Sequence, residues 1–398
     1  MSRRENPRVT VDDNFPVIEF DRLDFPAESY LGHGGFAAVA RARHRDWKQE
    51  VAVKRLLSQP TEGSERPLLY SEARKLNLGG RSTCIISLLG VCLEPHFAIV
   101  MPYMENGSLA RLLRDVDVPW ALRWRMTHEI SLGMTFLHCQ NPQILHCDLK
   151  AENVLLDDDF HAKISDFGLS KWRTESRVVT STSPTGATIT HAPPEYITDI
   201  NLVPTTKFDL YSFGVLLWEI ITRRKPYENA MNSALIELAV RRGQRPDMGL
   251  VPTNVPDVDT VSQLMQTCWS QNPDDRPSFM ECEDQLRAVK NNFRKEAFHE
   301  AIIYIMEGTE QRNAREAELK AKEKLRDQVK KQARDLRMQR ETIQKMEQQH
   351  HEQVRKLKQE EGKRHALEKQ TNDLKRALVE ERAQLQRHQR VRKSIVKF

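Results

Sequence analysis

Apolar residues recur with two different periods along the first three hundred positions. Before residue 102, short apolar runs predict strands at 38–43, 50–54, 86–93 and 97–101. Between the second and third runs, Leu68, Leu69, Ala73 and Leu76 recur at helical spacing, which predicts a helix over 67–76. Beyond residue 102 the pattern is helical, most clearly at 120–138. The apolar run at 213–221 predicts a helix that is buried on all sides.

The stretch from residue 309 to residue 398 follows another pattern. It contains no Pro, one Gly and one aromatic residue, and Ala, Glu, Lys, Leu, Arg and Gln dominate it, which is typical of a long helix. Seven-residue spacing predicts a coiled-coil seam with Val329, Leu336, Ile343, Leu378 and Leu385 at one position and Leu325, Met346, Leu367 and Leu374 at the other. Polar residues interrupt this seam at Gln332, Gln339, His350, Gln353, Glu360 and Arg364. A self-associating coiled coil and a single solvated helix held by charge pairs four residues apart both fit this pattern.

Charge is distributed unevenly between the two parts. The whole chain has a net charge of +5, with 61 Lys and Arg against 56 Asp and Glu. Residues 309–398 contain 26 basic and 15 acidic residues, so this tail has a net charge of +11 and the rest of the chain has −6. A basic tail can attract RNA or acidic membrane. Nucleic acid is the less favoured partner, because the tail lacks aromatic residues for base stacking and its charges alternate in sign.

Cysteine usage and hydropathy bear on the compartment. The six cysteines are scattered, with no CxxC pair and no His at metal-binding spacing, so buried free thiols in a reducing cytoplasm are expected. The N-terminal residues do not resemble a signal peptide, and residues 1–20 are expected to be disordered. The longest apolar run contains Glu219 and is too short to cross a bilayer, so no membrane span is expected.

The segment from Leu145 to Asn153 carries the strongest chemical signal. Asp148 can accept a proton from a hydroxyl nucleophile, Lys150 can stabilise a phosphoryl group during its transfer, and Asn153 can ligate Mg²⁺. A second candidate Mg²⁺ ligand, Asp166, follows and is succeeded by Phe and Gly. A lone His-x-Asp is more often part of a hydrogen-bonded loop, so the assignment depends on the other motifs that accompany it.

Two such motifs precede it. The glycines at 32, 34 and 35 allow the backbone to close over phosphates, although a plain β-hairpin would have the same pattern and Ala37 replaces the third glycine of the phosphate loop. Lys54 ends a Val-Ala-Val-Lys strand, and a buried ammonium group requires a carboxylate partner. Glu72, on the predicted helix, is the expected partner; the alternative is a solvated Glu72.

A long hydroxyl-rich segment follows Asp166 and ends at Glu195. Its composition is that of a loop, and Arg276 is expected to pair with Glu195 and to hold the end of this segment in place. The hydroxyl residues between these two acids are Ser170, Thr174, Ser176, Thr180, Ser181, Thr182, Ser183, Thr185, Thr188 and Thr190.

Together these motifs make residues 21–300 resemble a eukaryotic protein kinase of the receptor-interacting serine/threonine family. The motifs that carry the resemblance are His146-x-Asp148-x-Lys150-x-x-Asn153, the segment 167–173 and the segment 269–279. The resemblance implies an α+β, two-lobed kinase fold. The expected parts are a kinase domain at 21–293, with a small mainly β N-lobe at about 21–101 and a larger mainly α C-lobe at about 102–293, then a connecting helix at 294–308 and a helical tail at 309–398.

The same resemblance implies the function and the roles of the residues. We expect transfer of the γ-phosphoryl group of ATP to Ser or Thr of protein substrates in cytoplasmic immune or stress signalling, with autophosphorylation and Mg²⁺ as cofactor. The implied catalytic residues are Asp148, Lys150 and Asn153, and the implied Mg²⁺ ligands are Asn153 and Asp166. The implied ATP-binding residues are Leu31, Gly32, His33, Gly34, Gly35, Phe36, Ala37, Val39, Ala52, Lys54, Glu72, Met101, Met104 and Leu155.

Two departures from the resemblance affect regulation. Cys147 stands where many kinases have an Arg that binds a phosphate on the loop after Asp166, so control by one ordering phosphate is not expected. The second departure is the tail, which does not resemble a caspase-recruitment domain. A homodimer through the kinase domain or the tail is therefore expected, and a catalytically weak scaffold that oligomerises through its tail is the alternative function. The sequence does not identify an upstream receptor or adaptor.

Overall fold

The computed structural model describes residues 15–33, 37–56, 66–95, 97–166, 189–199 and 202–395. The chain forms two compact units, Met1–Glu310 and Gln311–Phe398, which are treated separately below. Several expectations lie outside the described residues. These are the disorder of residues 1–14, the phosphate-loop residues Gly34, Gly35 and Phe36, and the hydroxyl-rich segment from Phe167 to Thr188.

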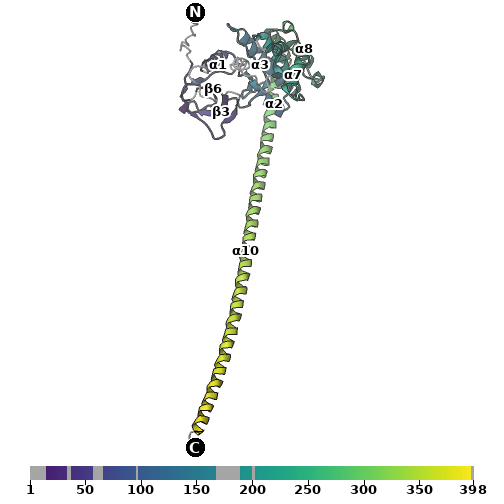
Figure 1. The fold of residues 1–398 in the computed structure, drawn as a ribbon. Helices are drawn as coiled ribbons and strands as arrows, with labels where there is room; N and C mark the ends of the chain where they lie inside the picture. The colour runs from purple at the N-terminus through teal and green to yellow at the C-terminus, as the bar shows by residue number, and fades with distance from the viewer. Residues whose placement is uncertain are drawn as a thin grey trace, which may run out of the picture. The chain divides into compact units, whose positions relative to one another are not determined.

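An antiparallel sheet of six strands forms the N-lobe (Figure 1). Its order is β1-β3-β4-β6-β5, and β2 pairs with the other half of β3. Helix α1 lies between β4 and β5 in sequence. The bounds are β1 Leu23–Asp24, β2 Tyr30–His33, β3 Ala37–His44, β4 Glu50–Leu56, α1 Arg66–Gly79, β5 Gly90–Cys92 and β6 Ala98–Pro102.

Alternation along β4 and β6 gives this sheet two different faces. Val51 and Val53 join Ala98 and Val100 in one buried cluster on one face of the sheet. The residues between them point the other way, because successive side chains of a strand lie on opposite faces. That second face carries Lys54 and Ala52, together with the residues that pair with them, Val39 and Met101.

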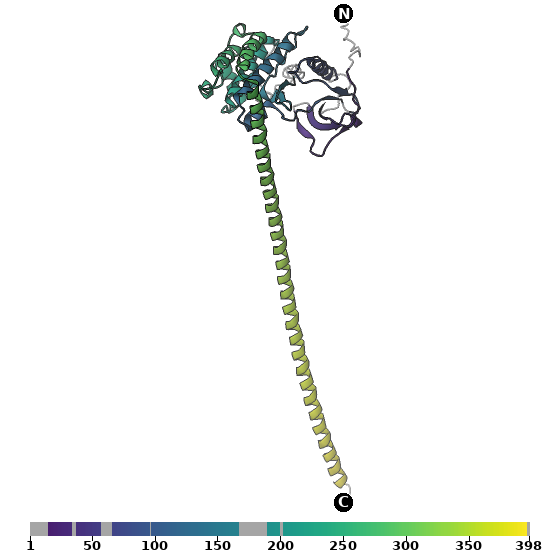
Figure 2. The same cartoon turned by 180° about the vertical axis from the view of Figure 1, so that it is seen from behind.

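Helices make up the C-lobe, which lies beside the sheet in both views (Figures 1 and 2). The apolar helix α6 is buried from Phe208 to Ile221 and packs against α3 and α8. It begins where the Thr205 side chain accepts a hydrogen bond from the backbone N–H of Lys207. The bounds are α2 Leu109–Asp115, α3 Trp120–His138, α5 Pro194–Thr198, α6 Thr206–Thr222, α7 Ser233–Arg241, α8 Val258–Cys268, α9 Phe279–Asn291 and α10 Lys295–Ile395.

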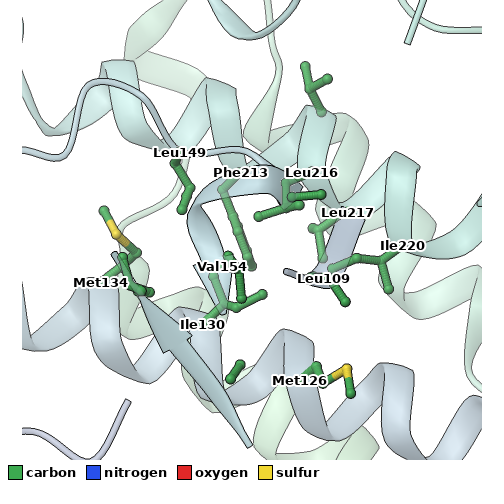
Figure 3. Packing of buried hydrophobic residues seen from close by; sticks show 14 of the residues in the cluster. Leu109, Met126, Ile130, Met134, Leu149, Val154, Phe213, Leu216, Leu217 and Ile220 are labelled. Atoms are coloured by element: carbon green, nitrogen blue, oxygen red, sulfur yellow. The ribbon is translucent and has the colours of Figure 1, made fainter. Parts of the chain in front are cut away.

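The hairpin of β7 (Val154–Leu156) and β8 (Ala162–Ile164) lies next to these helices. Figure 3 shows Leu149, inside the catalytic motif, and Val154, directly after it, between side chains of α3 and side chains of α6. All of these residues belong to one continuous core, which extends into the N-lobe through Leu76 of α1 and Met101 of β6. The catalytic segment therefore rests on the best-packed part of the molecule.

This architecture confirms the two-lobed α+β fold class with a long C-terminal helix, but three local expectations need correction. The predicted strand 86–93 shortens to β5, because Ile85 and Ile86 pair with Ile164 of β8 and so leave the sheet. The expected disorder up to residue 20 does not hold for Val17 and Ile18, which pair with Val91, since Ile18 is apolar enough to join the sheet's core. The expected connecting helix at 294–308 is not a distinct element but the beginning of α10, which continues through Gly308 because no Pro interrupts the helical pattern there.

The start of α10 belongs to the first unit, where Ala301 and Ile305 are buried in the core. From Gln311 onward the second unit is helix alone up to Ile395. Ion pairs four residues apart support it, such as Lys322 with Glu318 at 2.5 Å and Lys356 with Glu352 at 3.1 Å. No helix in the described part of the chain is both long enough and apolar enough to cross a membrane.

All six cysteines are free thiols. The expectation that they are buried is confirmed for Cys84, Cys92, Cys268 and Cys282, whereas Cys139 is exposed and Cys147 is half-buried. Burial raises the pKa of Cys84 and of Cys92 to about 11, so both thiols are protonated at neutral pH.

We predict that Gly214→Ala in α6 destabilises the first unit. A Cβ there would lie 3.0 Å from the backbone oxygen of Met265 and 3.0 Å from the backbone nitrogen of Trp269, and backbone atoms cannot easily shift. Such overpacking costs about 1–3 kcal/mol, which corresponds to a fall of about 2–8 °C in melting temperature.

Gly308→Ala in α10 is the matched control. A Cβ at this position meets nothing within 4 Å, and Ala favours a helix over Gly by up to about 1 kcal/mol. Thermal unfolding followed by circular dichroism measures both variants. Equal melting temperatures for Gly214→Ala and the wild-type chain would contradict the close packing of α6 on α8.

Candidate active site

Asp148, Lys150 and Asn153 form one buried polar cluster in the loop between α3 and β7. The Lys150 ammonium lies 3.1 Å from Asp148 Oδ2. Asn153 Nδ2 donates to the Asp148 backbone carbonyl at 2.8 Å and to Asp148 Oδ2 at 2.9 Å. Both amide hydrogens of Asn153 are thereby used, so its oxygen Oδ1 remains as the atom that can face a cation. The structure brings the three predicted catalytic residues together.

The carboxylate of Asp209 binds the backbone of this loop. Asp209 is fully buried in α6, and its two oxygens accept the backbone N–H of His146 at 2.9 Å and that of Cys147 at 2.7 Å. His138 at the end of α3 contributes a third contact, with Nε2 2.8 Å from Asp209 Oδ2. Cys147 has a φ of 58°, a left-handed conformation that costs free energy for a residue with a side chain. The contacts to Asp209 offset that cost and fix the loop directly before Asp148.

His146 connects the loop to the neighbouring hairpin. Its Nδ1 accepts the backbone N–H of Asp148 at 3.2 Å, and its Nε2 lies 3.0 Å from the carbonyl of Ser165. The two contacts together require the neutral ring with hydrogen on Nε2. Burial lowers the pKa of His146, in agreement with a neutral ring, although nearby Asp209 and Asp148 act in the opposite direction.

Lys54 of β4 reaches two carboxylates from different parts of the chain. Its ammonium lies 2.8 Å from Glu72 Oε1 on α1 and also forms an ion pair with Asp166. The side chains of Lys54 and Glu72 are 5% and 2% exposed, so the predicted ion pair is confirmed and the solvated alternative for Glu72 is wrong. Burial acts to lower the pKa of Lys54, but the charges of Asp166 and Glu72 outweigh it and raise the pKa above its ordinary value.

The β7–β8 hairpin brings the two candidate Mg²⁺ ligands to one end. Val154 pairs with Ile164, so Asn153 and Ser165 follow at the same end of the hairpin, and Ser165 donates its backbone N–H to the Asn153 carbonyl at 2.8 Å. Asp166 comes next, and its side chain is about half exposed. One amide oxygen and one accessible carboxylate fit Mg²⁺, which prefers oxygen ligands and fills its remaining positions with water and phosphate.

Because of the register of the sheet, four of the predicted ATP-binding residues lie on one face. Val39 pairs with Lys54, and Ala52 pairs with Met101, so these four side chains lie on the face opposite the Val51 cluster. Met104 and Leu155 pack against the core beside them. Leu31, Gly32 and His33 lie in β2, while Ala37, whose side chain is not described, begins β3.

Arg276 and Glu195 meet as the sequence predicts. The two guanidinium nitrogens lie 2.7 Å and 2.8 Å from the two oxygens of Glu195, a bidentate ion pair, and Arg276 is buried. Arg276 also donates to the carbonyls of Ser270 and Lys207. The pair therefore anchors the residue with which the hydroxyl-rich segment ends.

Sequence reasoning missed Asp209 and His138 as parts of this site. His138 was the last residue of a segment assigned simply as helix, and Asp209 lay just before the apolar run at 213–221. A signal was nevertheless present, because Asp209 is a carboxylate that opens an otherwise apolar run, and a buried carboxylate requires hydrogen-bond donors. Its partners, two backbone N–H groups far away in sequence, could not be identified without the fold.

The structure thus contains a buried cluster of Asp148, Lys150 and Asn153 and an ammonium group, that of Lys54, shared by Glu72 and Asp166; such an arrangement fits phosphoryl transfer. Comparison with known proteins agrees. Residues 26–286 match the family described as protein tyrosine and serine/threonine kinase. The chain therefore belongs to the protein kinase family, whose members use ATP and Mg²⁺ for phosphoryl transfer.

The similar proteins confirm the resemblance to receptor-interacting kinases. The chain is 42% identical over 321 residues to receptor-interacting serine/threonine-protein kinase 2 of Bos taurus, covering 78% of this chain and 59% of that protein. It is 36% identical over 286 residues to receptor-interacting serine/threonine-protein kinase 3 of Homo sapiens, covering 70% and 54% of the two chains. It is also 39% identical over 268 residues to ankyrin repeat and protein kinase domain-containing protein 1 of Homo sapiens, covering 66% and 35%. The chain thus spans between about a third and three-fifths of the length of these relatives.

We predict that the stability of the kinase unit falls on acidification and that His146 accounts for part of the fall. The pKa of His146 is lowered in the folded chain, so the unfolded chain binds the proton more readily and acid favours unfolding. This contribution is fully present above pH 6.5 or so, the ordinary pKa of His, and is lost as the pH falls below it. Melting temperatures measured between pH 7.5 and pH 5 should show the fall.

His146→Gln isolates that contribution. Gln can make neutral hydrogen bonds but does not titrate, so this variant should be less stable than wild type at pH 7.5 and should lose fewer degrees on acidification. Parallel curves of melting temperature against pH for the two chains would contradict the assignment of a neutral, buried His146.

Proposed function

We propose that this chain transfers the γ-phosphoryl group of ATP to Ser or Thr side chains of protein substrates. The observation that carries the proposal is the position of Lys54 between Glu72 and Asp166, next to the cluster of Asp148 and Asn153. If these ion pairs served only to stabilise the fold, a buried ammonium group shared by two carboxylates would not be needed beside a second polar cluster. A site that must hold several phosphate and metal charges does require such an arrangement.

Each side chain has a proposed role that follows from its contacts. Lys54, held by Glu72, binds the α- and β-phosphates, and the face formed by Val39, Ala52 and Met101 covers the adenine together with the backbone near Met104. Asn153 Oδ1 and the Asp166 carboxylate hold Mg²⁺, which neutralises phosphate charge when it is bound. These residues supply the binding half of the site.

The catalytic half orients the substrate. Asp148 accepts the proton of the substrate hydroxyl, and Lys150, 3.1 Å from it, stabilises the phosphoryl group during transfer. Because Asp148 is already fixed by Asn153 and by the backbone contacts of its loop, little reorganisation is required when the substrate arrives. Positioning and fixed charge supply most of the rate acceleration in reactions of this kind.

We further infer the division of the chain into a kinase domain at 21–293 and a basic tail at 309–398. The family match over residues 26–286 and the compact unit that ends at Glu310 support this division. The tail is proposed to bring two chains together as a homodimer. Apolar side chains that remain exposed along the second unit support this role, since a solvated single helix does not need them.

The pathway and compartment are also proposals. Two of the relatives compared above are named receptor-interacting kinases, which supports a role in signalling, and an immune or stress pathway is proposed by analogy with them. A cytoplasmic location is supported by six free thiols, four of them buried, because such thiols persist in a reducing compartment.

We predict that Asp148→Asn nearly abolishes phosphoryl transfer while the chain stays folded. The amide cannot accept the substrate proton, and loss of such a group lowers turnover by about 10²–10⁴-fold. Purified full-length protein with labelled ATP and a general protein substrate measures the rate, and circular dichroism verifies the fold.

Asp158→Asn is the matched control, since Asp158 carries an exposed carboxylate in the turn of the β7–β8 hairpin, outside the catalytic cluster. It should retain wild-type activity. An Asp148→Asn variant that is as active as wild type would overturn the enzyme proposal, and an inactive wild-type chain that still associates would favour the scaffold.

We predict autophosphorylation on hydroxyls between Ser176 and Thr190. Mass spectrometry should find phosphate there after incubation of the wild-type chain with ATP, and none in Asp148→Asn. Because Cys147 cannot bind a phosphate as Arg does, single alanine substitutions in this segment should lower activity only a few-fold. Complete loss of activity from one such alanine in a folded chain would contradict this interpretation of Cys147.

A further inference from the structure

Apolar side chains of the second unit remain exposed along one stripe of α10. Ten of them expose between 55% and 66% of their surface: Leu325, Val329, Leu336, Ile343, Met346, Leu357, Leu367, Leu374, Leu378 and Leu385. A run of exposed large apolar side chains is costly in water unless another surface covers it. The stripe is therefore a candidate interface.

These side chains share one uninterrupted heptad register. Steps of four and three residues, repeated from Leu325 to Leu385, pass through every one of the ten. Positions a are then Val329 and each seventh residue after it, and positions d are Leu325 and each seventh residue after it. A strict seven-residue repeat is the pattern of a left-handed coiled coil, in which a second helix covers the a and d positions.

The charges beside this seam specify how a second copy would lie. In a parallel dimer, the residue at position g contacts the residue five positions later on the other chain, at position e. Each charged pair of this kind is attractive: Asp335 faces Arg340, Lys356 faces Glu361, and Lys363 faces Glu368 of the second copy. Every other g–e pair between Gln328 and Arg382 contains at least one uncharged residue, so no like charges meet.

An antiparallel dimer of full overlap has the opposite balance. It places Val329 opposite Glu381 and Met346 opposite Arg364, so apolar side chains face charged ones. Its flanking contacts bring Arg326 close to Arg382, a repulsive pair. Glu347 meets Glu361 in the same way, and Lys356 meets its own copy, whereas Arg340 and Glu368 form the attractive pair of this arrangement. Repulsive flanking pairs therefore outnumber attractive ones.

Polar residues within the seam select the register of a parallel pair. When the two chains are aligned without a shift, each Gln at positions 332, 339 and 353 meets another Gln, and every apolar layer meets an identical layer. The same alignment brings Glu360, Arg364 and Glu381 each against its own copy, and these layers reduce the stability of the pair. If one chain shifted by seven residues, His350 of one chain would face Leu357 of the other. Leu357 of the first chain would then face Arg364 of the other. Polar residues at a and d reduce stability but fix register in this manner.

We propose that α10 forms a parallel, in-register coiled coil with a second copy of this chain. This inference rests on the self-association proposed above and specifies its geometry. Both kinase domains are then attached at the same end of the coiled coil, so each lies within reach of the other. Phosphorylation between the two chains becomes effectively intramolecular, at a local concentration on the order of millimolar.

Cross-linking of the full chain tests the orientation directly. The tail has no native cysteine, so Val329→Cys combined with Glu381→Cys introduces two unique thiols there. Under mild oxidation, a parallel in-register dimer gives disulfides that join 329 to 329 and 381 to 381. A fully overlapping antiparallel dimer gives 329 joined to 381, and mass spectrometry of the tail peptides distinguishes the two.

Charge reversal tests the recognition. Lys356→Glu with Lys363→Glu should weaken dimerisation at least about tenfold, because both residues would then face Glu on the second copy. Adding Glu361→Lys and Glu368→Lys to the same chain should restore it. Lys358→Glu with Lys369→Glu changes the net charge equally at positions outside the seam, so it should leave the dissociation constant unchanged.

Light scattering and sedimentation of the full chain separate the possible failures. A dimer that cross-links only between 329 and 381 overturns the parallel orientation but retains self-association. A monomer at tens of micromolar overturns both. A dimer that is insensitive to the Lys356 and Lys363 reversals overturns the proposed charge recognition.

Discussion

The carboxylate of Asp209 accepts two backbone N–H groups of the catalytic loop and contacts the ring of His138, inside helix α6, which is buried from Phe208 to Ile221. An unpaired carboxylate at this depth would be very unfavourable, so the loop and the helix require each other. The left-handed residue Cys147 is held by this contact, and Asp148 follows it immediately. The direction of the proposed catalytic base is therefore set by the core of the C-lobe and not by the loop itself.

A second interaction joins the two lobes through charge. Lys54 belongs to the sheet, Glu72 to helix α1, and Asp166 to the end of the β7–β8 hairpin, so one ammonium group links three elements from both lobes. In such an arrangement, displacement of α1 would separate Glu72 from Lys54 and leave the buried ammonium group with Asp166 as its remaining carboxylate partner. The position of α1 and the integrity of the proposed nucleotide site are consequently coupled through a single nitrogen atom.

Much of this could be predicted from the sequence, and the parts that could not have a common cause. Local patterns identified β3, β4, α1, α3 and α6, because strand and helix periods are properties of neighbouring residues. The Lys54–Glu72 and Glu195–Arg276 pairs could also be anticipated, since a buried charge restricts its possible partners. The early end of the strand near Ile86 and the role of Asp209 depend on contacts with residues that are distant in sequence, which periodicity does not record. The same limit applied to residues Val17 and Ile18, whose strand partner lies more than seventy positions away.

The anchoring of Glu195 by Arg276 has a consequence for how variants of this protein would present in a cell. Arg276 is buried and satisfies both oxygens of Glu195, and even Lys could not reproduce the bidentate contact. Its loss leaves a partly buried carboxylate without a partner, at a cost of several kcal/mol by analogy with other broken buried pairs. Alleles that change Arg276 would therefore lower the amount of protein that escapes proteolysis, whereas alleles that change Asp148, the proposed catalytic base, would leave normal amounts of folded chain.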